Sequence, residues 1–257
     1  AGLPMKCRTL RKYGHDSCAD PPHFVGGFAE YCLLGPGTAV FKIPDELSDD
    51  ETCPANCALA TVVAGWEAAE LRPLETVLIL GAGALGFYAA AFARHTGCAE
   101  VIVADVQDRR LAAVEAFGAT ATINTCGRTE GEIVEIVRDR TEGRGADAVL
   151  EVAGVPEAVP LGLRCLRIGG RLVELGNTYP GALVSYDVSD LIFRCLAIRG
   201  VHNYDARHLR RGLDFLTQTR SVYPFGRLVT HHFPLHRIND ALRMAESGEG
   251  IRVAVCP

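Results

Sequence analysis

The sequence predicts an α/β protein built on a doubly wound parallel sheet, and three observations support this fold class. From Thr76 onward, short apolar runs alternate with longer amphipathic stretches, as in repeated strand-helix units. A glycine-rich turn joins the first apolar run, 76–80, to the first amphipathic stretch, 84–95. The 257 residues are 48% hydrophobic and 22% charged, a globular composition that can bury a sizeable core.

The elements of this expected sheet follow in order along the chain. Residues 76–80 and 101–104 are short and apolar, which favours buried strands, and each is followed by apolar residues at helical spacing, over 84–95 and 108–117. The further expected strands are 121–123, 148–152, 171–175 and 196–200, and the further expected helices are 130–140 and 157–166. The pattern therefore predicts about six strands in one sheet.

The two flanks of this region have a different pattern. Residues 1–62 are rich in Pro and Gly, with strand-like pieces at 28–34 and 39–43 between turns. After about residue 202 we expect two helices, over 207–216 and 238–246, and two strands, over 228–233 and 251–255. The chain is thus expected to fold as a central sheet domain with a separate, loop-rich region before it.

Charge and cysteine content exclude several functional classes. A net charge of -5 gives no general attraction for nucleic acid or an anionic membrane, so neither partner is expected. The apolar run 82–93 contains two glycines and is too short for a span of roughly 20 residues. The 10 cysteines are irregularly spaced, which suggests reduced thiols, metal ligands or core residues in a cytoplasmic protein without disulfides. The opening residues also lack the pattern of a secretory signal.

The glycine-rich turn is the first candidate site. Gly81, Gly83 and Gly86 fit the G-x-G-x-x-G spacing, which is weak alone but strong between a predicted strand and a predicted helix. The first Gly permits the tight turn, the second admits a pyrophosphate to the backbone, and the third allows close packing of helix on strand. The helix N-terminus then favours the phosphate charge. In the structural alternative, these glycines only form a turn.

Asp105 extends this site to the end of the next expected strand. A carboxylate at this spacing accepts hydrogen bonds from ribose hydroxyls and repels a 2′-phosphate, which favours NAD over NADP. Arg109 and Arg110 leave NADP open, because an arginine can hold a 2′-phosphate. Asp105 could also be a simple strand cap.

Several motifs then resemble the zinc-dependent medium-chain dehydrogenase/reductase family, which contains alcohol, sorbitol and threonine dehydrogenases. They are Gly2-Leu-Pro-Met-Lys-Cys7, Gly26-Gly-Phe-Ala-Glu-Tyr31, Asn56-Cys-Ala-Leu-Ala-Thr61 and Ser247-Gly-Glu-Gly-Ile-Arg252. Tyr13-Gly-His-Asp16 and Gly200-Val-His-Asn-Tyr204 are closest to the subgroup called phosphonate-catabolism-associated alcohol dehydrogenases. The resemblance covers essentially the whole chain.

This resemblance implies a fold, a division into domains and an activity. Residues 63–201 would form a Rossmann NAD-binding domain, while 1–62 and 202–257 would belong to an incomplete, β-rich, GroES-like catalytic domain. The implied activity is hydride transfer between an alcohol or aldehyde and NAD, with zinc polarising the substrate oxygen. Residues 196–201 resemble the edge strand through which family subunits pair, so a homodimer or homotetramer is expected.

The implied zinc ligands are incomplete in this chain. Cys57 matches the third ligand of the catalytic zinc, and Cys7 matches the last of four structural-zinc cysteines. The other ligands would lie before Ala1, and His15 follows Cys7, so it does not match the Gly-His-Glu ligand motif. Catalytic zinc needs about three protein ligands, so we expect this chain alone to hold zinc poorly and to be inactive. In the structural alternative, Cys57 is a small core residue without a metal.

The resemblance also assigns cofactor contacts, each with an ordinary structural alternative. Thr61 would touch the nicotinamide, or be a helix-interior residue; Arg252 would reach the pyrophosphate, or be a solvated arginine. Arg110 would lie on the adenosine ribose, or be an arginine on an exposed helix face. The backbone groups of Leu175, Val201 and Asn203 would hold the carboxamide. Two hypotheses compete with the implied activity: a sorbitol- or threonine-type dehydrogenase, and a non-catalytic NAD-binding remnant.

Overall fold

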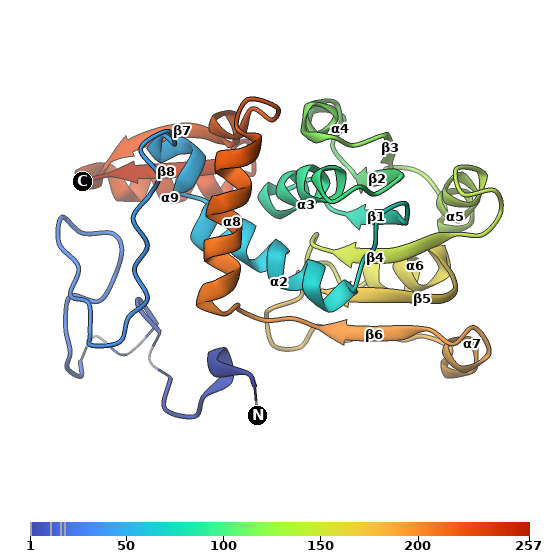
Figure 1. The fold of residues 1–257 in the computed structure, drawn as a ribbon, viewed down its shortest axis with the longest axis horizontal. Coiled ribbons are helices and arrows are strands. Elements are labelled where there is room, and N and C mark those ends of the chain that lie inside the picture. Colours follow the sequence, from blue (N-terminus) through green and yellow to red (C-terminus); the bar gives the residue numbers. More distant parts are fainter. Residues whose placement is uncertain (1, 11, 16, 18) are drawn as a thin grey trace.

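The computed structural model describes residues 2–10, 12–15, 17 and 19–257, and a six-stranded parallel sheet forms its centre (Figure 1). Its strands are β1 (Thr76–Leu80), β2 (Glu100–Asp105), β3 (Ala121–Asn124), β4 (Ala146–Glu151), β5 (Leu166–Glu174) and β6 (Ala197–Gly200). Their order is β3-β2-β1-β4-β5-β6, and all five pairings are parallel. The predicted fold class is confirmed, and the strand order reverses between β1 and β4.

Alternating side chains place one apolar core on each face of the sheet. Val77 and Ile79 of β1 join one cluster, and Leu78 and Leu80 join the other. The first face packs against α2 (Ala60–Ala69), α3 (Ala84–His95) and α8 (Ala206–Thr219), and the second against α5 (Glu130–Asp139) and α6 (Ala158–Cys165). Because both faces are covered, β1 is buried along its whole length.

The remaining elements are short. They are η1 (Pro4–Lys6), α1 (Asp49–Thr52), η2 (Ala55–Leu59), α4 (Asp108–Val114), η3 (Glu115–Phe117), α7 (Val188–Phe193), η4 (Phe225–Leu228), η5 (Leu235–Arg237) and α9 (Ile238–Glu246). The last two strands, β7 (Val229–Pro234) and β8 (Arg252–Cys256), pair in parallel as a separate small sheet. Figure 1 shows this sheet and the N-terminal residues on the same side of the six-stranded sheet.

The N-terminal region corrects one expectation. The predicted strand-like pieces 28–34 and 39–43 form no strand, although the Leu33 amide donates to the Phe24 carbonyl over 2.7 Å. A strand needs a neighbour that satisfies its backbone groups, and no described segment pairs with these two. The two strand-like pieces are therefore wrong, whereas the loop-rich character expected of residues 1–62 is confirmed for the part of this region that the structure describes.

Within the described ranges, no helix has both the length and the low polarity needed to cross a bilayer.

Candidate dinucleotide site

The glycine turn lies at the carboxyl end of β1, beside the point where the strand order reverses. Gly81 has a φ of +110°, and a Cβ there would lie 2.7 Å from the amide nitrogen of Ala153 in the turn after β4. A Cβ on Gly86 would lie 2.0 Å from the Gly81 carbonyl oxygen. Both positions therefore need glycine for close backbone packing, as the motif predicts.

Gly83 differs from the other two glycines because a Cβ there would meet nothing within 4 Å. Gly83 is the N-cap residue of α3, and no side chain caps that helix end. The turn therefore leaves open space in front of amide groups at the N-terminus of a 12-residue helix. Such an arrangement accepts a phosphate group, and the helix dipole favours its charge.

Asp105, the last residue of β2, is fixed beside this turn. Its Oδ2 accepts a hydrogen bond of 2.6 Å from the Ala82 amide, and its Oδ1 accepts one of 2.9 Å from the Gln107 amide. A cavity of about 400 Å³ opens here between the ends of β1, β2 and β4. Four of the predicted residues line it: Gly81, Gly83, Asp105 and Arg110.

Arg110 links this cavity to the C-terminal segment. Its Nη2 donates a 3.1 Å hydrogen bond to the Gly248 carbonyl, and the neighbouring Arg109 donates to the Glu249 carbonyl. The Nε atom of Arg110 is buried without a partner among the described atoms. A buried donor without an acceptor costs free energy. A ligand oxygen that accepts a hydrogen bond from Arg110 Nε in this cavity would remove that cost. This geometry fits a ribose or phosphate oxygen of a dinucleotide.

A second cavity, of about 510 Å³, lies at the carboxyl ends of β5 and β6. Leu175 and Val201 line it, whereas Asn203, at a φ of +64°, does not. The amides of Leu175 and Val201 donate to strand carbonyls of Glu151 and Glu174, so the sheet holds their backbone in place. These positions agree with a nicotinamide seat, but the assigned contacts stay predictions.

The remaining predicted cofactor contacts, Thr61 and Arg252, lie outside the two cavities. Thr61 lies in the first turn of α2, and its hydroxyl donates over 2.6 Å to the carbonyl of Cys57 in the preceding π-helical turn η2. Arg252 belongs to β8, and its buried Nε also has no described partner. Neither Thr61 nor Arg252 lines the two cavities. Their roles toward a cofactor therefore stay predictions too.

The described residues do not fit a zinc site. Cys57 and Cys7 are both exposed, and the Cys7 thiol hydrogen-bonds the Thr9 hydroxyl, which lowers the pKa of Cys7. In the described ranges, no three His, Cys, Asp or Glu side chains come together as ligands. Zinc is held by four ligands in structural sites and by about three in catalytic sites.

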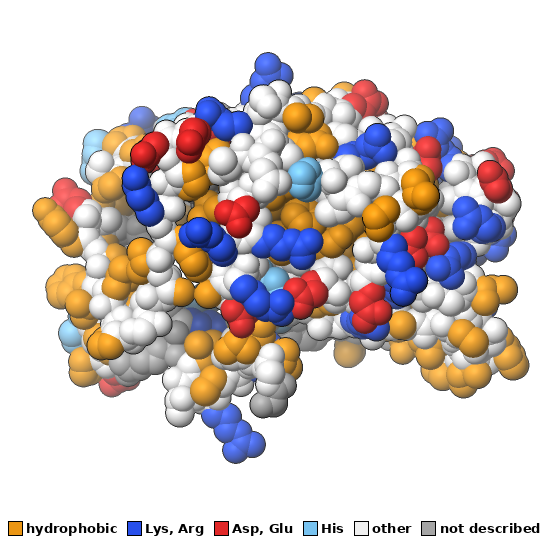
Figure 2. All heavy atoms as spheres, in the orientation of Figure 1, with side chains coloured by type: hydrophobic (Ala, Val, Ile, Leu, Met, Phe, Trp, Pro, Cys, Tyr) orange, Lys and Arg blue, Asp and Glu red, His pale blue; other side chains and the backbone are white. Residues whose placement is uncertain are grey.

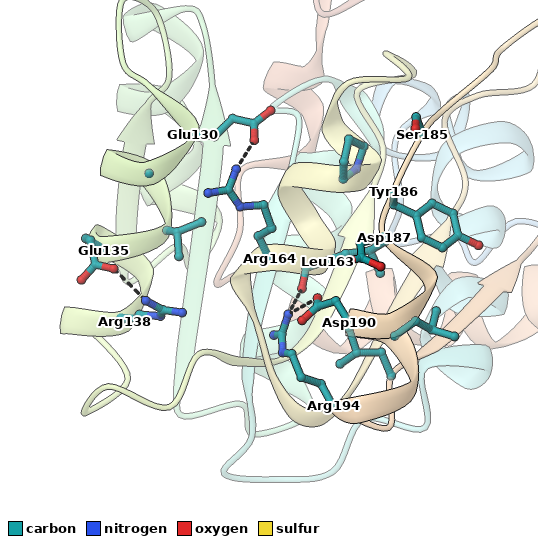
Figure 3. Close-up of a pocket in the computed structure, with 15 residues that line it drawn as sticks. Glu130, Glu135, Arg138, Leu163, Arg164, Ser185, Tyr186, Asp187, Asp190 and Arg194 are labelled. Carbon is teal, nitrogen blue, oxygen red and sulfur yellow. Dashed lines mark hydrogen bonds and ion pairs between the residues drawn. The ribbon is translucent and has the colours of Figure 1, made fainter.

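A further hollow, of about 710 Å³, lies between α5, α6 and α7 (Figure 3). Its charged side chains pair with one another, as in Glu130 with Arg164 and Asp190 with Arg194. Because each of the three arginines that line it is paired with a carboxylate, this hollow offers no unpaired arginine to a phosphate.

Fold and site together define a dinucleotide-binding protein with a Rossmann-type sheet. The family of zinc-binding dehydrogenases matches residues 84–218, about half of the chain, and the chain belongs to this family. It is 32% identical over 236 residues to an L-threonine 3-dehydrogenase of Shewanella halifaxensis, covering 88% of this chain and 64% of that protein.

Solved structures agree with this assignment. An alcohol dehydrogenase of Thermotoga maritima superposes with a TM-score of 0.93 at 30% identity, covering 99% of this chain and 70% of that one. A zinc-binding dehydrogenase from Sinorhizobium meliloti, bound to NADP, gives a TM-score of 0.82 at 30% identity, covering 98% and 70%. The chain therefore spans about two thirds of the length of these relatives.

Proposed function

We propose that this chain binds NAD and belongs to an enzyme that transfers hydride between an alcohol or aldehyde and the nicotinamide. The observation that carries the proposal is the 400 Å³ cavity, where the glycine turn, the α3 N-terminus and Asp105 meet at the reversal of strand order. NAD would supply the hydride acceptor. The glycine turn would hold its pyrophosphate, and Asp105 its ribose.

Preference for NAD over NADP rests on the fixed carboxylate of Asp105. A 2′-phosphate would meet this negative charge, while Arg109 and Arg110 already donate to carbonyls of residues 248–249. The alternative is a non-catalytic NAD-binding protein, which the scattered positions of Cys7 and Cys57 favour.

We further propose that the substrate alcohol carries an anionic group such as a phosphonate. The second cavity is lined by Lys6 and His202, and the Lys6 ammonium donates to His202 Nδ1 over 2.5 Å. Burial and the charges of Lys6, Lys12 and His15 lower the pKa of His202, as expected for a locally positive region. An anion in this cavity would be attracted by that potential.

The first part of the test is cofactor binding. We expect NADH to quench protein fluorescence at concentrations at least tenfold below those needed for NADPH.

The second part is substrate binding in the presence of NADH. Among a hydroxyalkylphosphonate, threonine, a polyol and a neutral alcohol, only the phosphonate should bind the chain. Lys6→Gln should weaken this binding about tenfold, and the exposed control Lys42→Gln should not. NADH binding without binding of any alcohol would favour the non-catalytic alternative. Preferential binding of threonine would favour the threonine-type dehydrogenase instead.

We also propose that two copies pair through the β6 edge. β6 is the last strand of the sheet, and α7 beside it exposes Val188, Ile192 and Phe193, the last at 82%. Figure 2 shows hydrophobic side chains gathered over the α7 end of the molecule. An unpaired strand edge next to an exposed apolar helix is typical of a subunit interface.

Light scattering after gel filtration tests this pairing. The chain should elute as a dimer or tetramer, and Phe193→Asp should shift it to a monomer, because a charge would be buried at the interface. The control Val222→Asp, at a position exposed by 65% after α8, should leave the oligomer intact. A monomeric parent chain would contradict the proposal.

A further inference from the structure

Two acidic side chains stand next to each other at the carboxyl ends of β4 and β5. Glu151 and Glu174 are register partners in the parallel pairing and the last residues of their strands. Glu151 has no exposed surface, and the Oε2 atom of Glu174 is buried without a hydrogen-bond partner in the described part of the chain. Two neighbouring buried carboxylates repel strongly, so such a pair favours retention of one proton.

Each carboxyl group shapes the turn that follows its own strand. Glu151 Oε1 accepts hydrogen bonds from the amides of Ala153 and Gly154, over 2.9 and 2.8 Å. Glu174 Oε1 accepts from the amides of Gly176 and Asn177, over 3.1 and 2.8 Å. The Asn177 Nδ2 group donates to both acids, over 3.3 Å to Glu151 and 3.1 Å to Glu174. The acids therefore connect turns 152–154 and 175–177.

These two turns lie between the two cavities. Ala153 lines the cavity of the glycine turn, and Glu174 and Asn177 line the cavity at the ends of β5 and β6. The turns also touch: a Cβ on Gly176 would lie 2.4 Å from the Gly154 nitrogen and 2.4 Å from Glu151 Oε2. The turns between the two cavities therefore pack directly against each other and against Glu151.

The surroundings keep the proton in the pair at neutral pH. Burial raises the pKa of Glu151 to about 8, and the hydrogen bond and charge of Glu174 add to this effect. From outside the two strands, Lys6 and His202 face the same cavity as Glu174. The pKa of His202 is lowered, so this group is already neutral in the range where Glu151 would titrate. The bonds from Ala153 and Gly154 act in the opposite direction but are smaller causes.

We propose that Glu151 and Glu174 are positioning residues that share one proton, and that this proton holds turns 152–154 and 175–177 in the spacing that accepts the nicotinamide half of the dinucleotide. The proposal rests on the proposed function. When the proton passes to solvent, the two carboxylates repel, Gly154 and Gly176 separate, and the cofactor binds less tightly.

The experiment measures NADH binding to the whole chain by fluorescence between pH 6.5 and 9.5. The dissociation constant of the parent chain should rise with pH above a midpoint near 8, approaching tenfold per pH unit when one proton is linked to binding. Glu174→Gln, in which a neutral amide replaces the protonated acid, should bind NADH with the same affinity across this range. Glu135→Gln removes an exposed acid paired with Arg138 on α5 and should behave like the parent.

A second measurement follows the proton itself. Infrared difference spectra between pH 7 and 9.5 should show the carbonyl band of a protonated carboxyl group that disappears at high pH, and Glu151→Gln should lack it. Absence of this band in the parent, or a Glu174→Gln chain that keeps the parent's pH dependence, would overturn the proposal. If no chain binds NADH at any pH, the proposed function fails, whereas the infrared band still decides whether the proton is shared.

Discussion

Gly86→Ala is expected to destabilise the fold by about 3 kcal/mol or more, whereas Gly83→Ala is expected to leave the fold intact and weaken NADH binding. A methyl group at position 86 would lie 2.0 Å from the Gly81 carbonyl oxygen, and this neighbour is backbone of the same turn. It cannot move aside without separating α3 from β1. The cost should therefore appear in urea unfolding followed by circular dichroism.

Gly83→Ala is the matched control for Gly86→Ala. A methyl group there meets nothing within 4 Å, and the φ of -84° suits any residue, so the free energy of unfolding should change by less than about 1 kcal/mol. The methyl would instead occupy the approach of the pyrophosphate, so NADH affinity should fall at least tenfold. A Gly83→Ala chain that binds NADH like the parent would show that the pyrophosphate does not lie on this turn. A fully stable Gly86→Ala chain would contradict the packing argument.

The parts of this fold that the sequence predicts are those specified by local pattern. The run 76–80 is apolar at every position but the first, and it proves buried throughout because helices cover both sheet faces. The glycine spacing then identifies the turn, since Gly86 is needed for a contact with Gly81 and Gly81 for a contact with the turn after the adjacent strand. Local periodicity is enough to predict the strand 76–80, and turn chemistry is enough to predict the glycine turn that follows it.

Features that depend on long-range pairing are not predicted from the sequence. The Glu151 and Glu174 pair arises from strand register between residues far apart in sequence, and a lone Glu at the end of an apolar run gives no such signal. Two acids at the ends of successive parallel strands could have suggested the contact, because such ends meet at one sheet edge. The predictions for segments 28–34 and 39–43 are wrong because strand-like residues form no strand without a pairing partner.

The zinc assignments show the limit of transferring single residues. Cys57 occupies an irregular turn before α2 and is exposed, and no described ligand set gathers around it. A metal site depends on several side chains converging, so one matching residue specifies a position in the chain but not a site.

Arg171→Met is expected to cost about 2 to 3 kcal/mol of stability, more than its distance from the cofactor turn suggests. Arg171 lies in β5, where its Nη2 pairs with Glu75 and also donates to the Glu70 carbonyl over 3.1 Å. Its Nε donates to the Ala69 carbonyl at the end of α2. Both members of the pair are largely buried, with 13% and 17% of their side chains exposed. Truncation would leave the Glu75 carboxylate with the more distant Arg167 Nη2, at 3.8 Å, and the Arg72 amide, at 2.9 Å.

The matched control is Arg138→Met, which breaks an exposed pair with Glu135 on α5 and should cost less than about 1 kcal/mol. Urea unfolding of both variants and of the double variant Arg171→Met with Glu75→Gln separates the causes. The double variant should regain part of the loss, because the partly compensated Glu75 charge is removed. Equal costs for the two single variants would contradict the burial argument. Since Arg171 holds the end of α2 against the sheet, its loss should also destabilise this helix, which contains Thr61 and follows Cys57.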